Sequence, residues 1–134
     1  MGLKIYLDSY LVIYLIEEHP VFSLILEKLI ARQTDLIIAV SNLTAMECLV
    51  MPLRNNNRIL IEKFENWFKQ AQTVSLEKKI FYQASQLRAD FTSLKTPATL
   101  HLATAVYHSC DEFWTNDNRL DKVAPNIVKN ILTI

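Results

Sequence analysis

The chain has 134 residues, of which 51% are hydrophobic and 21% charged, as in ordinary soluble globular domains. Fourteen Lys and Arg balance fourteen Asp and Glu, so the chain as a whole does not attract polyanions, and a nucleic acid could bind only at a local site. The single glycine, Gly2, excludes the phosphate-binding loops G-x-x-x-x-G-K-[ST] and G-x-G-x-x-G. The length predicts a single domain over residues 1–134.

No segment of the sequence is typical of a membrane span or a secretory signal. The longest uncharged stretch, residues 96–110, is shorter than the ~18 residues that a spanning helix needs. Residues 1–8 lack a basic segment followed by an apolar run and a cleavage site. We therefore expect a cytoplasmic protein with no membrane contact. Cys48 and Cys110 stand among apolar residues without C-x-x-C pairing, which predicts buried, reduced thiols.

Short apolar, β-branched runs alternate with segments of helical periodicity. The pattern predicts, in chain order, a strand at 3–7, helices at 9–18 and 21–32, a strand at 36–40, helices at 41–51 and 58–71, a strand at 73–76, helices at 78–91 and 96–109, and strands at 112–115 and 127–134. Pro52 is expected to interrupt the third helix, and Thr96 to cap the last one. This alternation favours an α/β fold: a three-layer sandwich around a mainly parallel sheet, with right-handed crossovers.

Three carboxylates follow predicted strands: Asp8 after the first, Glu47 in the helix after the second, and Asp117 after the fourth. The crevice of such a sheet lies beyond the carboxyl ends of its strands, so we expect the fold to bring the three acids together. Each acid also has a purely structural alternative. Asp8 could cap the following helix, Asp117 could belong to a turn between two asparagines, and Glu47 could close a capping box with Thr44.

Converging carboxylates need a compensating charge, because at about 5 Å and an effective dielectric near 20 each pair repels by roughly 3 kcal/mol. No lysine or arginine is expected beside these positions in the sequence to supply that charge, whereas Mg²⁺ or Mn²⁺ suits a site of carboxylates. Zinc is disfavoured because the three histidines lack paired ligand spacing. His101, between two leucines, is expected to be a partly buried packing residue rather than a general base. A metal site on an α/β domain without a nucleotide loop favours phosphodiester hydrolysis.

At these acids the sequence resembles the PIN-domain family, and more closely the VapC-like toxins of bacterial toxin–antitoxin pairs. The resemblance covers almost the whole chain. The matching segments are Ile5-Tyr6-Leu7-Asp8-Ser9, Leu43-Thr44-Ala45-Met46-Glu47, Leu100-His101-Leu102-Ala103-Thr104-Ala105 and Phe113-Trp114-Thr115-Asn116-Asp117.

The resemblance implies a PIN-like fold and a Mg²⁺-dependent (or Mn²⁺-dependent) endoribonuclease toxin. Its catalytic and metal-site acids would be Asp8, Glu47 and Asp117. The side chains implied to support them by hydrogen bonds are Ser9, Thr115 and Asn116. The resemblance further implies an RNA substrate, with transfer RNA as one candidate, a homodimer, and a small cognate antitoxin as partner.

The chain departs from the family pattern at Ala98. Family members usually carry an acid two residues after the threonine of a Thr-Pro-Asp-Ala-like helix start, whereas this chain reads Thr96-Pro97-Ala98-Thr99. The first turn of a helix stabilises negative charge by about 0.3–1 kcal/mol, so the position suits a carboxylate. Thr99 is turned about 100° away along the helix, and Asp90 does not align with the motif. We therefore expect the turnover to be weakened or absent.

Two other functions stay open on the sequence alone. A catalytically dead PIN domain could keep the fold and bind the antitoxin or RNA, and Ala98 is the residue that discriminates this reading. A phosphotransfer domain similar to haloacid dehalogenases would use Asp8 as nucleophile. This last alternative is weaker, because Tyr10 occupies the second acid position of the Asp-x-Asp motif.

Overall fold

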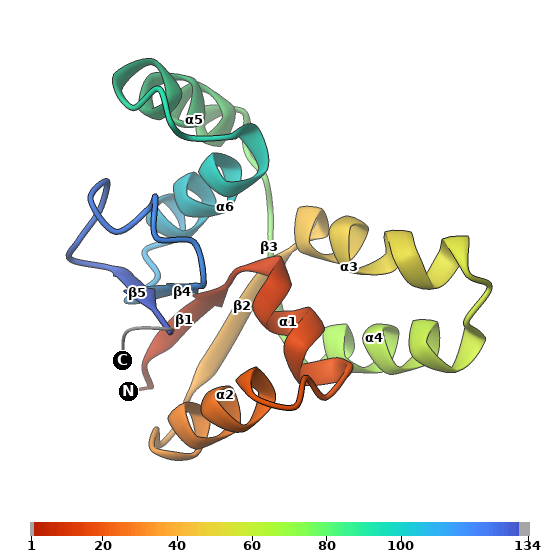
Figure 1. Ribbon diagram of the computed structural model, residues 1–134. Coiled ribbons are helices and arrows are strands. Elements are labelled where there is room, and N and C mark those ends of the chain that lie inside the picture. Colours follow the sequence, from red (N-terminus) through yellow and green to blue (C-terminus); the bar gives the residue numbers. More distant parts are fainter. Residues whose placement is uncertain (1, 132–134) are drawn as a thin grey trace.

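The computed structural model, which describes residues 2–131, contains a five-stranded sheet with helices on both faces (Figure 1). All neighbouring strands pair in parallel, in the order β3-β2-β1-β4-β5, which confirms the predicted α/β class and parallel sheet. The strands are β1 (Lys4–Leu7), β2 (Ile37–Ser41), β3 (Gln72–Val74), β4 (Glu112–Thr115) and β5 (Val128–Asn130). Residues 132–134 of the last predicted strand lie outside the described residues.

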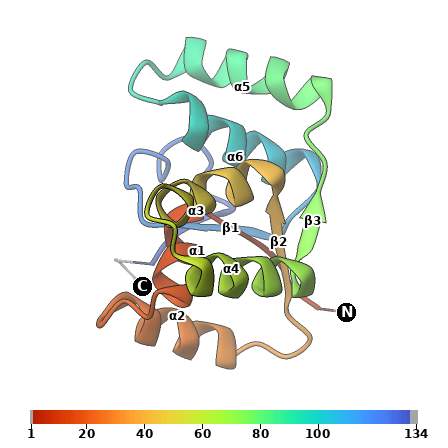
Figure 2. The same cartoon turned by 90° about the vertical axis from the view of Figure 1, so that its right-hand side faces the viewer.

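The six helices form layers on either side of this sheet (Figures 1 and 2). They are α1 (Ser9–Ile16), α2 (Phe22–Ala31), α3 (Asn42–Arg54), α4 (Arg58–Gln70), α5 (Lys78–Asp90) and α6 (Thr96–Tyr107). The connections from β1 through β2 to β3 place α1–α4 on one face, and the reversed step from β3 to β4 places α6 on the other. Helix α5 packs against α6. No helix within residues 2–131 is long and apolar enough to cross a membrane.

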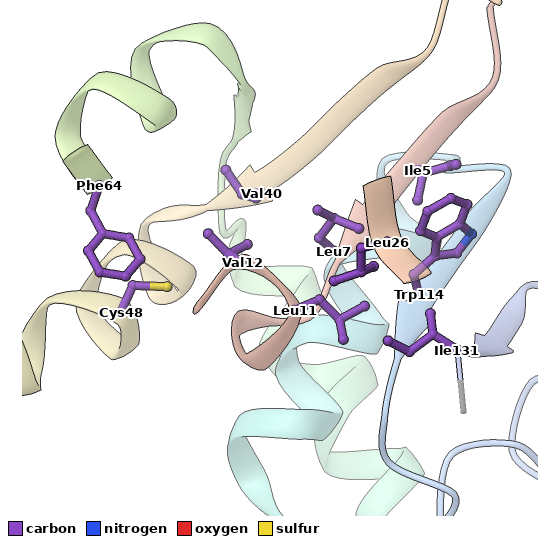
Figure 3. Packing of buried hydrophobic residues seen from close by; sticks show 10 residues of the cluster. All are labelled: Ile5, Leu7, Leu11, Val12, Leu26, Val40, Cys48, Phe64, Trp114 and Ile131. Atoms are coloured by element: carbon purple, nitrogen blue, oxygen red, sulfur yellow. The ribbon is translucent and has the colours of Figure 1, made fainter. Parts of the chain in front are cut away.

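The central strand β1 sends alternate side chains into two cores, because successive residues of a strand point to opposite faces. Ile5 and Leu7 pack against α1–α4 in the cluster drawn in Figure 3. Tyr6 points the other way and packs with Leu102 of α6 and Phe113 of β4. All five side chains are buried, and each buried Leu or Ile contributes about 1.5–3 kcal/mol. The central strand is therefore fixed from both faces just before the chain reaches Asp8.

Two predictions about helix ends are wrong. Helix α3 continues through Pro52 to Arg54: the proline lacks the N–H that would donate to the Cys48 carbonyl oxygen, but later bonds, such as that from the Asn55 N–H to the Met51 carbonyl oxygen at 3.0 Å, keep the helical path. At the other helix, Lys95 rather than Thr96 is the N-cap residue of α6. The Thr96 hydroxyl instead accepts a hydrogen bond from Arg88 Nη1 at 2.9 Å, so it joins α6 to α5.

Both cysteines are buried and unpaired, as predicted. Cys48 belongs to the core on the α1–α4 side, and Cys110 to the core on the α6 side. Burial, together with the nearby negative charges of Glu47, Glu17 and Asp8, raises the pKa of the Cys48 thiol to about 12. The Cys48 thiol is therefore protonated at neutral pH and is a poor nucleophile.

Candidate functional site

A pocket of about 590 Å³ opens at the carboxyl ends of the central strands. The winding of the sheet reverses beside β1, which is where ligands bind in open parallel sheets. The residues that line the pocket are Asp8, Ser9, Tyr10, Glu47, Lys95, Pro97, Ala98, His101, Asn116, Asp117, Asn118, Arg119 and Asn130. The structure thus places the three predicted acids around one pocket, although they come from β1, α3 and the segment after β4.

Asp8 directly follows β1 and is only 6% exposed. Its Oδ1 accepts a hydrogen bond from the Ser9 backbone N–H at 2.8 Å, and its Oδ2 accepts one from the Thr115 hydroxyl at 2.7 Å. Burial raises the pKa of Asp8, and the charge of His101 and these two hydrogen bonds offset only part of that effect. The helix-cap alternative is also correct, since Asp8 is the N-cap of α1. Both hydrogen bonds come from neutral groups, so a cation in the pocket would stabilise this carboxylate.

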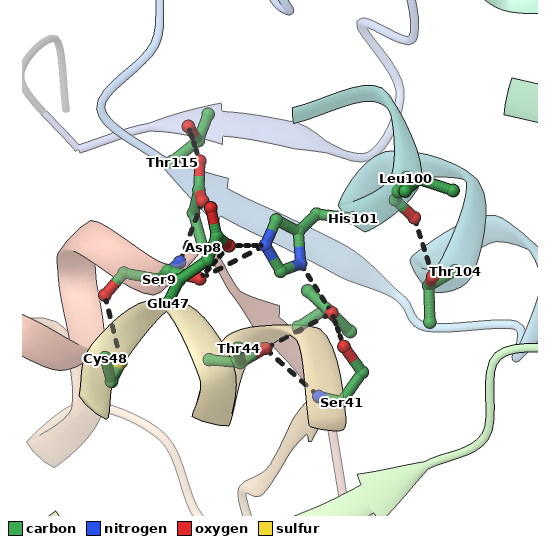
Figure 4. Close-up of polar contacts among 11 residues, drawn as sticks. Asp8, Ser9, Ser41, Thr44, Glu47, Cys48, Leu100, His101, Thr104 and Thr115 are labelled. Atoms are coloured by element: carbon green, nitrogen blue, oxygen red, sulfur yellow. Dashed lines mark hydrogen bonds and ion pairs between the residues drawn. The ribbon is translucent and has the colours of Figure 1, made fainter. Parts of the chain in front are cut away.

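Glu47 extends from α3 toward Asp8 and the start of α1 (Figure 4). Its Oε1 accepts a hydrogen bond from the Ser9 hydroxyl at 2.7 Å and lies 2.5 Å from His101 Nε2. Burial raises the pKa of Glu47, but the hydrogen bonds from His101 and Ser9 and the charge of His101 lower it more, so the net shift is downward. The suggested capping box of Glu47 with Thr44 is wrong. The box consists of Thr44 and Ser41, which leaves Glu47 available to the pocket.

His101 is buried more completely than expected, and besides packing against Tyr6 it lines the pocket. It is 1% exposed, and its Nδ1 lies 2.7 Å from the Tyr6 hydroxyl while its Nε2 faces Glu47 and, at 3.1 Å, the Ser9 hydroxyl. Figure 4 shows its ring between the carboxylates and the polar side chains at the end of β2. One signal was present in the sequence: His101 follows Ala98 by three residues, so both share the face of α6 that lines the pocket.

Asp117 follows β4 and forms a bidentate ion pair with Arg119. Arg119 Nε donates to Oδ1 at 2.9 Å and Nη2 donates to Oδ2 at 2.7 Å, while the Arg119 backbone N–H also donates to Oδ1. The side-chain hydrogen bond from Arg119 is the largest cause that lowers the pKa of Asp117; burial opposes it, and the charge of Lys95 adds to it. Asp117 does belong to a turn, in which the Leu120 backbone N–H donates to the Asp117 carbonyl oxygen at 3.3 Å. The expectation that no lysine or arginine lies beside the acids is wrong, since Arg119 pairs with Asp117.

Of the other residues considered in the sequence, some line the pocket and some do not. Ala98 lines the pocket from the first turn of α6. The Asn116 amide donates to Tyr14 Oη at 3.0 Å rather than to a carboxylate. The Thr99 hydroxyl donates to the Lys95 carbonyl oxygen at 2.6 Å, so it is engaged in its own helix. Neither Thr99 nor Asp90 of α5 lines the pocket.

The donor chemistry of the pocket fits a hard divalent cation, because carboxylate oxygens are the ligands that Mg²⁺ and Mn²⁺ prefer. The buried Asp8, which has only neutral hydrogen-bond donors, is the observation that favours a cation here. Within residues 2–131, however, no three acidic, imidazole or thiol groups already form a complete metal-ligand cluster. Asp117 would have to exchange Arg119 for the ion, so the site can bind a metal only after local rearrangement.

The fold and the pocket define a class of parallel α/β domains that gather acidic side chains at the carboxyl ends of their central strands. The family model described as the PIN domain matches residues 5–125, so this chain belongs to the PIN-domain family. A comparison with curated protein sequences found no significant match.

Solved structures of the same fold include toxin–antitoxin proteins. VapBC2 from Rickettsia felis, bound to a DNA fragment from its promoter, is 17% identical, with a TM-score of 0.75 over 95% of this chain and 98% of that one. A toxin–antitoxin complex from Klebsiella pneumoniae is 21% identical, with a TM-score of 0.73 over 93% and 96%. Mycobacterium tuberculosis VapC20, a sarcin–ricin loop cleaving toxin, is 11% identical, with a TM-score of 0.71 over 85% and 90%. At these identities the similarity establishes the fold.

Proposed function

We propose that this PIN domain is the Mg²⁺- or Mn²⁺-dependent endoribonuclease of a toxin–antitoxin pair, and that Ala98 weakens its turnover. The observation that carries the proposal is the placement of Asp8, Glu47 and Asp117 around one pocket at the carboxyl ends of parallel strands. The similar fold of VapC20, a toxin that cleaves the sarcin–ricin loop, supports RNA as the substrate.

The metal would be held by these three carboxylates, and when bound it would supply an activated water and stabilise the leaving oxygen. The chain's own groups orient the carboxylates. Ser9 donates to Asp8 through its backbone and to Glu47 through its hydroxyl, so one residue fixes the spacing of two acids. The Thr115 hydroxyl fixes the second oxygen of Asp8 and also accepts a hydrogen bond from the Asp117 backbone N–H at 3.0 Å. Ser9 and Thr115 are therefore positioning residues in this proposal.

Ala98 changes the charge balance of the pocket. The lining contains three carboxylates but also Lys95, Arg119 and His101. A fourth acid at position 98 would lie in the first turn of α6, where the helix N-terminus stabilises negative charge. Without it, the negative charge that attracts a divalent ion is largely offset by side chains of the protein itself, and we expect a weakly held metal.

We also propose a cognate antitoxin and a second copy of the chain as partners, acting in the cytoplasm. The complexes among the similar folds support the antitoxin. Helices α3 and α4 carry a row of exposed apolar side chains that a protein partner would cover: Met46, Val50, Met51, Leu53 and Ile59. A sedimentation profile of a pure monomer at high micromolar concentration would contradict the homodimer.

The second candidate is a catalytically silent PIN domain that binds the antitoxin or RNA. Two observations favour it. Ala98 cannot ligate a metal, and Glu47 and Asp117 already pair with His101 and Arg119. This candidate keeps the pocket as a recognition surface rather than as a catalytic site.

Cleavage of a mixed transfer-RNA pool with Mg²⁺ or Mn²⁺ tests the proposal and separates the two candidates. The chain is compared with its Ala98→Asp variant, with EDTA as the metal control and Asp8→Asn/Ala98→Asp as the matched inactive variant. We expect Ala98→Asp to cleave faster by about tenfold or more, since restoring one ligand that lowers the barrier by ~1.4 kcal/mol gives that factor. Equal cleavage by both proteins would mean that three acids suffice. Absence of cleavage by either protein would contradict the nuclease and favour the silent module.

A further inference from the structure

Tyr10 is an aromatic residue that the fold leaves uncovered at the mouth of the acidic pocket. It follows Asp8 and Ser9 at the start of α1, lines the pocket, and is 61% exposed. Its ring lies 6.5 Å from that of Tyr14, at a tilt of 35°. The Tyr14 hydroxyl in turn accepts a hydrogen bond from the Asn116 amide. The Tyr10 ring belongs neither to the hydrophobic core nor to the hydrogen bonds that orient the carboxylates.

Behind Tyr10, an aromatic row gives this edge of the pocket a rigid support. The Tyr14 ring lies 4.9 Å from His19 and 4.9 Å from Phe22, and the His19 and Phe22 rings stack at 4.6 Å. Tyr10 is thus the solvent-exposed end of a packed series of rings. An exposed ring with a fixed backing is the kind of surface on which single-stranded nucleic acids stack their bases.

The same pocket carries two cations that suit phosphate groups. Lys95 precedes α6, and no hydrogen bond or ion pair of its ammonium occurs among residues 2–131. The Arg119 side chain is 41% exposed although it pairs with Asp117. Arginine and lysine are the usual phosphate contacts in nucleic-acid interfaces. The pocket volume of about 590 Å³ also lies within the range of roughly 300–1,000 Å³ for ligand sites.

We infer that the pocket takes a single-stranded segment of nucleic acid, with one base stacked on Tyr10 and the adjoining phosphates held by Lys95 and Arg119. The inference rests on the proposed function, which makes that strand RNA. A duplex does not fit this arrangement, because its base faces are covered by neighbouring base pairs. Since the chain has no net charge, recognition depends on these few side chains rather than on a general attraction.

Fluorescence anisotropy with a labelled, mixed-sequence, single-stranded RNA oligonucleotide tests the inference. EDTA is present, so that binding is measured without cleavage. Tyr10→Ala should raise the Kd about tenfold, because one stacked base contributes roughly 1–3 kcal/mol, and Tyr10→Phe should keep it within about twofold. The matched control is Tyr82→Ala, which removes a tyrosine of similar exposure, 65%, from α5 outside the pocket. Thermal unfolding of each variant establishes that it is folded.

Salt dependence tests the phosphate contacts separately. Two contacts to a single strand predict a slope of log K against log salt of about −1.4, and Lys95→Ala should reduce its magnitude by about 0.7. Equal effects of Tyr10→Ala and Tyr82→Ala, or equally tight binding of duplex RNA, would overturn the inference. It would also fall if Tyr10→Ala left RNA binding unchanged but weakened binding of the antitoxin. In each of these cases metal-dependent cleavage could persist, so the proposed function would stand. A chain that neither bound nor cleaved RNA would overturn both.

Discussion

The two sides of the pocket hold their carboxylates by different partners, a buried histidine on one side and an exposed arginine on the other. On the buried side, Glu47 pairs with His101, which is 1% exposed and also contacts the buried Tyr6. On the exposed side, Asp117 pairs with Arg119, whose side chain is 41% exposed. Water screens the second pair, so its partners can separate at little cost, whereas the first pair cannot separate without leaving polar groups buried.

Because of this difference, one side of the site is rigid and the other side can move. The buried side is preorganised, since Ser9 and His101 fix Glu47 while Ser9 and Thr115 fix Asp8. The exposed side can adapt, since the exposed ion pair between Arg119 and Asp117 can open at little cost. Asp8 and Glu47 therefore keep their positions without a ligand, whereas Asp117 can change its position when a ligand binds. Substitutions on the two sides should therefore differ in their effect on stability.

The largest effect on stability is expected from His101→Ala. The change leaves a cavity in the core and removes hydrogen-bond partners from Tyr6 and Glu47. Chemical denaturation should show a loss of about 2–4 kcal/mol in the free energy of unfolding. His101→Gln, which keeps polar atoms at the end of the side chain, should lose less. A loss below about 1 kcal/mol for His101→Ala would mean that the buried side is not the rigid part of the site.

An intermediate effect, of opposite sign, is expected from Asp8→Asn in EDTA. Burial raises the pKa of Asp8, so the stability it contributes is fully present below its unfolded pKa and is lost as the pH rises through the raised folded value. Asparagine carries no charge at any pH, so the variant should melt higher at pH 7, by roughly 2–5 °C, with a smaller gain at pH 4. Differential scanning calorimetry at both pH values measures this. An equal gain at both values would refute the assignment to the buried charge.

The Asp8→Asn variant also tests whether Asp8 binds Mg²⁺. Adding Mg²⁺ should raise the melting temperature of the unmodified chain, because a ligand that binds only the folded state stabilises it. Asp8→Asn should lose most of that rise. If the rise is the same in both proteins, Asp8 is not a metal ligand.

The smallest effect is expected from Arg119→Ala. Because the ion pair with Asp117 is exposed, the free energy of unfolding should change by no more than about 0.5 kcal/mol at pH 7, as for the control Arg54→Ala on the surface of α3. Carboxyl NMR should nevertheless show the pKa of Asp117 rising toward its ordinary value, since Arg119 is the main cause that lowers it. The stability that Asp117 contributes, present above its unfolded pKa and lost as the pH falls, should shrink accordingly. An unchanged Asp117 pKa would contradict the ion pair.

Sequence periodicity was sufficient to predict the parallel sheet and to place Asp8 and Asp117 beyond strand ends. These are local properties, because an apolar run followed by an acid is visible within a few residues. The helix at 9–18 was predicted too long, since the chain leaves α1 after Ile16 and Glu18 adopts a φ of 54°. Nothing in the local pattern marks that turn, because the chain has no glycine there to signal a positive φ.

The role of His101 could not be read from its neighbours, because its partners are distant in sequence. Glu47 is 54 residues away and Tyr6 is 95 residues away, so only the packing of α6 against the sheet brings them together. The pair of Asp117 and Arg119 was missed for another reason. The two residues are close in sequence, but their contact depends on the turn after β4, whose geometry the sequence does not specify.

The position of β1 in the middle of the sheet also bears on how the protein is made. Strand β1 is synthesised before β4 and must wait for it, because the hydrogen bond between Asp8 and Thr115 closes a loop of 107 residues. Contacts of such long range form late, because their loop-closure entropy must be overcome before they stabilise the chain. The complete pocket therefore cannot form on a nascent chain before the segment that carries Thr115, Asp117 and Arg119 has left the ribosome.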